Sequence, residues 1–254
     1  MPVSGDLRDY LMSGVVERIA RSAERDAFVL RGGALTRIWL APERRPARDL
    51  DFVGDFAFDV ADTRARLERA LAAPVADAIA IGAIAATPMW EHTAFPGVRA
   101  AIAIGLDRAD LRMTIDIGFG DPLVPPATAI AFAGSASTVE VRAVRPETQL
   151  AWKLHGLAEQ GAEWRPKDLA DAWRIAKRVA LDDARLADAI TAAFGSRGFT
   201  RAQATELFAL PHWATKTARV RWPRPEPLAD AIAELHARLA PVLAALPTTT
   251  GWPA

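Results

Sequence analysis

Apolar residues recur every four positions near the start of the chain. Leu7, Leu11, Val15 and Ile19 share one side of residues 5–24 at this spacing, which predicts an amphipathic helix. Short apolar or alternating runs farther along predict β-strands instead. We expect strands over residues 26–30, 47–56, 78–87, 97–106, 110–119 and 138–144, and helices over residues 34–41 and 60–73.

The pattern becomes helical throughout after Arg145. Pro166 suits the first turn of a helix, and Thr200 can cap the start of another. Helices are expected over residues 147–160, 166–181, 182–194, 201–210 and 228–246. We therefore predict an α+β fold: residues 1–145 form a domain with a mixed sheet and flanking helices, and residues 146–254 form an all-helical domain.

Composition removes several classes of function. The 254 residues include 31 Lys and Arg and 31 Asp and Glu, so the net charge is zero. The overall charge therefore does not indicate a large nucleic-acid-binding surface. The absence of cysteine excludes disulfides, zinc–thiolate sites, iron–sulfur clusters and thiol catalysis. The apolar run at residues 78–90 is too short to span a membrane, and the N-terminus lacks a signal-peptide pattern. We expect a soluble, cytoplasmic protein without a membrane partner.

Two adjacent glycines follow the first predicted strand. Gly32 and Gly33 let the backbone approach a ligand closely, and the helix after them can offer its N–H groups to a phosphate. Taken alone, such a pair more often marks a simple tight turn.

Three acidic residues lie within strands that otherwise read as buried. Asp49 and Asp51 lie on the same side of an extended chain, where two carboxylates repel by roughly 2–3 kcal/mol at an effective dielectric of about 20. Asp116 stands between two isoleucines in a later strand. A solvated strand face is one interpretation; the other is a Mg²⁺ site, because a divalent cation removes the repulsion and also binds substrate phosphates.

The helical part adds one more polar cluster. Lys153 lies beside an apolar stripe, and Asp168 and Asp171 share one face of the following helix. Taken alone, these acids also fit a favourable interaction with a helix N-terminus.

These motifs, in this order, resemble a known family. The segments FVLRGGALTRIW, RRPARDLDF, TIDIGFGD, AWKLHGL and RPKDLADAW closely resemble the AbiEii/AbiGii-type toxin nucleotidyltransferases of the polymerase-β-like superfamily. The resemblance covers about residues 25–180. It implies a nucleotidyltransferase-type mixed sheet followed by a helical domain that completes the active site.

The resemblance also implies roles for individual residues. The metal ligands would be Asp49, Asp51 and Asp116, which are also catalytic together with Lys153 and Asp168. Nucleotide-binding positions would be Gly32, Gly33, Thr36, Arg45 and Lys153. Two positions depart from the family pattern: Ala34 replaces a hydroxyl residue after the glycines, and Ala47 replaces a Ser or Thr before the first aspartate.

The implied function is Mg²⁺-dependent transfer of a nucleotide from an NTP to an acceptor hydroxyl. By resemblance, the acceptor is the 3′ end of tRNA or another RNA, in a toxin–antitoxin or phage-defence setting with a cognate antitoxin. Two alternatives stay open: transfer to a protein or small molecule, and nucleotide binding with little turnover. The sequence does not determine the oligomeric state.

One basic segment is a weaker candidate for RNA contact. It combines cations with tryptophans that could stack on bases, at Trp213, Lys216, Arg219, Arg221, Trp222 and Arg224. A solvated loop with its tryptophans packed inward is the competing interpretation.

Overall fold

A computed structural model describes residues 5–41, 47, 49–106, 109–209, 222–249 and 251–252. Arg45 and most of the basic segment (Trp213, Lys216, Arg219 and Arg221) lie outside the described residues. The chain divides into two compact units, which we call the sheet unit (Met1–Asp121 with Ala127–Val144) and the helical unit (Pro122–Pro126 with Arg145–Ala254). Each unit is described by itself.

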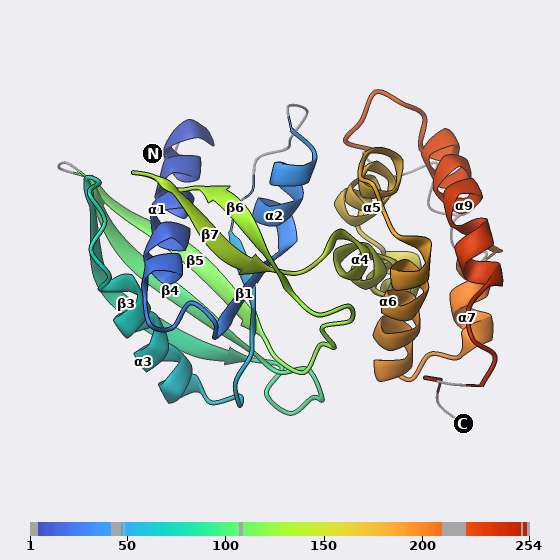
Figure 1. The fold of residues 1–254 in the computed structure, drawn as a ribbon, viewed down its shortest axis with the longest axis horizontal. Helices are drawn as coiled ribbons and strands as arrows, with labels where there is room; N and C mark the ends of the chain where they lie inside the picture. The colour runs from blue at the N-terminus through green and yellow to red at the C-terminus, as the bar shows by residue number, and fades with distance from the viewer. Residues whose placement is uncertain are drawn as a thin grey trace. The chain divides into compact units, whose positions relative to one another are not determined.

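The sheet unit is built on one mixed sheet (Figure 1). Its seven strands are β1 (Phe28–Arg31), β2 (Leu50–Gly54), β3 (Ile79–Met89), β4 (Gly97–Leu106), β5 (Ala109–Gly118), β6 (Thr128–Ala133) and β7 (Thr138–Ala143). They lie in the order β3-β4-β5-β2-β1-β7-β6. The β1–β7 and β2–β5 pairs are parallel, and the other pairs are antiparallel.

Three helices accompany the sheet: α1 (Gly5–Arg21), α2 (Gly32–Trp39) and α3 (Val60–Leu71). Along β4 and β5, buried apolar residues alternate with more exposed ones, as expected for strands with one face in the core. Helices α1 and α3 lie together against the sheet in Figure 1, and α3 contacts β3 and β4. The opposite face of β4 and β5 is therefore left for polar side chains.

The helical unit contains α4 (Pro146–Gln160), α5 (Pro166–Arg178), α6 (Asp183–Ser196), α7 (Arg201–Thr205) and α9 (Leu228–Ala244), with short 3₁₀ turns at Gly161–Glu163 and Leu207–Ala209. Helix α4 packs against α5 and α6, and α5 packs against α9. Leu150, Leu154 and Leu157 of α4 are buried, as their four- and three-residue spacing predicts. Within the described residues, no helix is long and apolar enough to cross a membrane.

The predicted α+β fold is confirmed, and three elements differ most from the sequence-based expectations. Strand β6 was not predicted, because its alternation is carried by Ile130 and Phe132 among alanines, which have low strand propensity. The strand expected over residues 47–56 spans only Leu50–Gly54. The helix expected over residues 201–210 ends at Thr205.

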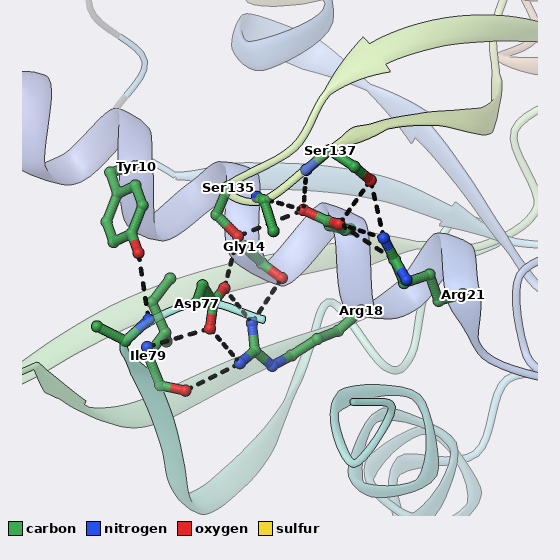
Figure 2. Close-up of polar contacts among 11 residues, drawn as sticks. Tyr10, Gly14, Arg18, Arg21, Asp77, Ile79, Ser135 and Ser137 are labelled. Atoms are coloured by element: carbon green, nitrogen blue, oxygen red, sulfur yellow. Dashed lines mark hydrogen bonds and ion pairs between the residues drawn. The ribbon is translucent and has the colours of Figure 1, made fainter. Parts of the chain in front are cut away.

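A buried polar network joins α1 to both edges of the sheet (Figure 2). The Arg18 guanidinium donates to both carboxylate oxygens of Asp77, at 2.8 and 2.7 Å, just before edge strand β3. Glu17, whose side chain is 0% exposed, accepts a 2.8 Å hydrogen bond from the backbone N–H of Ala136 in the β6–β7 turn. The Ser135 hydroxyl in that turn donates to Asp77 at 2.5 Å. The sheet is therefore curved enough for its two edge strands to be bridged through one cluster.

We expect this network to make the sheet unit sensitive to acid. Burial acts to raise the pKa of Glu17 and of Asp77, but their hydrogen bonds outweigh it and hold both pKa values below the ordinary 4.5 and 3.8. A lowered pKa contributes stability that is complete above the ordinary value and is lost as the pH falls through the folded-state value. Urea unfolding should therefore give a constant free energy from about pH 7 to 5 and a steep decrease below about pH 4.

Candidate active site

Two predicted metal ligands lie side by side on adjacent strands. The parallel β2–β5 register pairs Asp51 with Asp116. The antiparallel neighbours extend the row, pairing Arg31 of β1 with Asp51 and Arg99 of β4 with Asp116. Paired residues on neighbouring strands project from the same face, about 5 Å apart. The sheet therefore presents a row of two carboxylates flanked by two arginines.

Arg99 forms a two-pronged ion pair with Asp116. Its Nε and Nη2 donate to the two carboxylate oxygens at 2.8 and 2.7 Å. The Arg99 side chain is 54% exposed, whereas that of Asp116 is 18% exposed. Sequence reasoning missed Arg99, although it is the one charged residue in the run GVRAAIAIGL. Pairing residues 97–106 with 110–119 as a hairpin would have placed it opposite Asp116.

Asp49 belongs to the same electrostatic environment. It lies just before β2 and two residues before Asp51. The hydrogen bond to Asp116 and the negative charge of this carboxylate raise the pKa of Arg99 above its ordinary value. The charges of Asp49 and Asp51 raise this pKa further. All three predicted metal ligands therefore act on one guanidinium group.

Gly32 packs directly against Asp51. It begins α2 with a φ of +72°, and a Cβ atom at this position would lie 2.1 Å from the Asp51 Oδ2. The Thr36 hydroxyl donates to the Gly32 carbonyl at 2.9 Å and is buried. Thr36 thus braces the turn from within the helix. The start of α2, where the helix dipole is positive, lies beside the carboxylate row.

Gly32→Ala should disrupt this arrangement. The new methyl group would overlap Asp51, and the left-handed backbone conformation is unfavourable for alanine. We expect a loss of about 2–4 kcal/mol in the free energy of unfolding and displacement of Asp51. Chemical denaturation measures the loss. Gly156→Ala is the matched control, because a Cβ at this helical position meets no atom within 4 Å, and it should stabilise by up to about 1 kcal/mol. Equal stability of the two variants would contradict the role given to Gly32.

The second arginine of the row is held by a different acid. Arg31 Nη1 donates to Asp121 Oδ2 at 2.9 Å. The Arg31 guanidinium also lies over Gly118, where a Cβ would come within 3.2 Å of Nη2. Arg31 thus crosses the sheet face from β1 toward the end of β5. Asp121, in the segment GDPL after β5, was not among the predicted site residues.

The residues of the row suit a divalent cation. Carboxylate oxygens on neighbouring strands match the preference of Mg²⁺ for one or two carboxylates plus phosphate oxygens. In this structure the charge of Asp116 is compensated by Arg99. Within the described residues, however, no three His, Asp or Glu side chains converge closely enough to hold an ion together.

The helical unit contains the remaining predicted site residues. Lys153 Nζ of α4 lies 2.5 Å from Asp168 Oδ1 and 3.5 Å from Asp171 Oδ2, both on α5. Arg165 Nε lies 2.6 Å from Asp168 Oδ2. Burial acts to raise the pKa of Asp168, but Lys153 and the cations at residues 165 and 167 hold it below the ordinary value. Lys153 and Asp168 are therefore a partly buried charged pair.

The structure brings the predicted residues together in two groups. Asp49, Asp51, Asp116 and Gly32, with Gly33 and Thr36 on α2, belong to the sheet unit, and Lys153 and Asp168 belong to the helical unit. Asp55, which follows β2 and is exposed, pairs with Arg142 at 2.6 Å.

Comparisons with known proteins add a family and a fold. The family model "Nucleotidyl transferase AbiEii toxin, Type IV TA system" matches residues 15–247. Two Helicobacter pylori crystal structures are similar, those of JHP933 and of a putative nucleotidyltransferase, each with a TM-score of 0.55, 15% identity and 97% of this chain covered. The alignments cover 94% and 97% of those chains. A search of curated protein sequences found no match. At this identity the two structures support the fold, which is nucleotidyltransferase-like.

Proposed function

Because the chain belongs to the AbiEii nucleotidyl transferase toxin family, we propose that it transfers a nucleotide from an NTP to an acceptor hydroxyl at the carboxylate row. The observation that carries this proposal is the pairing of Asp51 with Asp116 beside the glycine that begins α2. Phosphoryl transfer needs positioned phosphates and compensated negative charge more than it needs covalent help from the protein. The row, the turn and the nearby arginines supply those features.

Asp51 and Asp116, with Asp49 just before β2, would hold Mg²⁺ together with oxygens of the triphosphate. When bound, the metal supplies positive charge to the triphosphate and to the oxygens that attack and leave. The turn at Gly32 and Gly33 lets the backbone approach the triphosphate, since Gly32 carries no side chain between α2 and Asp51. An acceptor hydroxyl oxygen then bonds to the α-phosphorus, the bond to pyrophosphate breaks, and the hydroxyl proton passes to water.

By the family resemblance, Lys153 and Asp168 of the helical unit would have roles in the same reaction. The Lys153 ammonium neutralises charge that develops on the phosphates. Asp168 orients Lys153 through the 2.5 Å contact, and Arg165 secures Asp168 from its other oxygen. The nucleotide-binding role of Arg45 rests on the sequence alone, since this residue lies outside the described part of the chain.

The proposed acceptor is the 3′ end of tRNA or another RNA, in a toxin–antitoxin setting with a cognate antitoxin as partner. The purified protein is incubated with each α-³²P-labelled NTP, Mg²⁺ and total tRNA. Label in tRNA, abolished by EDTA, is the expected result. Label only in protein or in a small molecule would replace the RNA acceptor, and no labelled product with any acceptor would contradict nucleotidyl transfer.

A further inference from the structure

We propose that the Arg99 side chain has two positions. It pairs with Asp116 in the metal-free protein, and it moves to a substrate phosphate once a cation binds to the carboxylate of Asp116. This inference rests on the proposed function, because it assigns Asp116 to a metal. It adds a positioning residue that neither the sequence motifs nor the family resemblance indicated.

The first position is defined by the geometry of the ion pair. Both oxygens of Asp116 accept from the planar guanidinium of Arg99, at 2.8 and 2.7 Å. A guanidinium bound in this way directs its positive charge at the carboxylate oxygens that a metal would need. A divalent ion at the same oxygens would be strongly repelled by it. Cation binding and the Arg99–Asp116 pair are therefore competing states.

The surroundings of Arg99 allow it to leave. On β4, its neighbours on the same face are Gly97 and Ala101, which have little or no side chain. The residue paired with Arg99 on the neighbouring strand β3 is Thr87, which is exposed. With 54% of its side chain exposed, Arg99 can change rotamer without opening the core.

The second position follows from the chemistry of the displaced group. Arg99 lies on β4 next to the row, so its guanidinium stays within reach of a phosphate bound there after it leaves Asp116. A phosphate offers it the same two-pronged arrangement of oxygens as the carboxylate it has left. The NTP brings that phosphate together with the metal, so the exchange couples metal binding to substrate binding.

Arg99→Gln tests the first position through metal affinity rather than activity. Mn²⁺ binding to the full chain is measured by electron paramagnetic resonance, without nucleotide. Losing the competing cation should tighten Mn²⁺ binding about tenfold. Arg112→Gln is the matched control. Arg112 is exposed on β5, four residues from Asp116 and on the same face. Its substitution removes an equal charge, but at a distance of about 13 Å from Asp116. We expect this control to change Mn²⁺ affinity less than twofold.

The second position is tested with inorganic tripolyphosphate as the probe. At saturating Mn²⁺, Arg99→Gln should bind tripolyphosphate about tenfold more weakly than the wild type, while Arg112→Gln should bind it normally. Opposite changes for metal and triphosphate exclude a purely structural role, because a loss of packing alone would not move the two affinities in opposite directions.

The outcomes separate this inference from the proposed function. Unchanged Mn²⁺ affinity in Arg99→Gln, with normal Mn²⁺ binding by the wild type, would overturn the competition and leave the metal site standing. Tighter Mn²⁺ binding with unchanged tripolyphosphate affinity would overturn the move to phosphate. Failure of the wild type to bind Mn²⁺ would overturn both this inference and the metal-dependent function.

Discussion

Replacing Asp51 by asparagine should reduce nucleotidyl transfer at least about a thousandfold while leaving the protein folded. Asparagine keeps the shape of the side chain but removes the charge that would hold the metal and, through it, the triphosphate. Asp51 pairs with Asp116 and lies against Gly32, so it stands where the two carboxylates and the glycine turn meet. The initial rate of label transfer from NTP, with thermal unfolding as the check on folding, measures the effect.

Asp55→Asn is the matched control for this prediction. Asp55 follows the same strand by one residue but pairs with Arg142, at 2.6 Å, instead of joining the row. The Asp55→Asn variant should transfer nucleotide at a rate within about threefold of the wild type. Asp55 is outside the row, and losing an exposed ion pair changes the stability of the fold little. Transfer by Asp51→Asn at more than about a tenth of the wild-type rate would remove Asp51 from the chemistry. A similar loss in both variants would point to a general effect of charge on the strand.

Asp168→Asn should destabilise the helical unit by about 3 kcal/mol at pH 7. The side chain of Asp168 is 6% exposed, and removing its charge leaves Lys153, 15% exposed, without its closest partner. For a chain of this size, such a loss lowers the melting temperature by roughly 6–12 °C. Differential scanning calorimetry measures the change, and the exposed Asp188→Asn on α6 serves as the control, with an expected shift of about 1–2 °C or less.

The same variant gives a prediction with a definite sign in pH. The pKa of Asp168 is held below its ordinary value of 3.8, so its charge contributes stability above that value. As the pH falls through the folded-state pKa, the wild type gains a proton there and loses that contribution. The difference between wild type and Asp168→Asn should therefore be full at pH 7 and shrink below about pH 4. A difference that stayed constant with pH would show that packing, and not charge, causes the destabilisation.

Local patterns in the sequence were enough to predict much of the fold. The amphipathic spacing near the N-terminus predicted α1, and Pro166 marked the first residue of α5. Strand β6 was missed because alanine carries little strand preference, and its position is set by pairing with β7. Strand order was not predictable either, since the parallel pairing of β2 with β5 joins segments more than 60 residues apart.

The candidate site, like the fold, could be predicted only where local sequence patterns were enough. Asp49, Asp51 and Asp116 could be selected because a charge within an apolar run is visible in sequence, whereas the pairing of Asp51 with Asp116 depends on register. Arg99 joins the site only through its pairing across the β4–β5 hairpin. The sequence marked Thr36 as a ligand-binding hydroxyl, but it could not show that this group bonds to the carbonyl of Gly32 inside α2.

The proposed function requires the carboxylate row to bind a metal together with a nucleotide. Crystals grown with Mn²⁺ and an NTP analogue that cannot be cleaved between its α- and β-phosphates test it most directly, because manganese is located by its anomalous scattering. We predict an anomalous peak about 2.0–2.3 Å from carboxylate oxygens of Asp51 and Asp116, with the triphosphate bound beside Gly32. A nucleotide bound away from this face of the sheet, or a metal peak that touches neither aspartate, would contradict it.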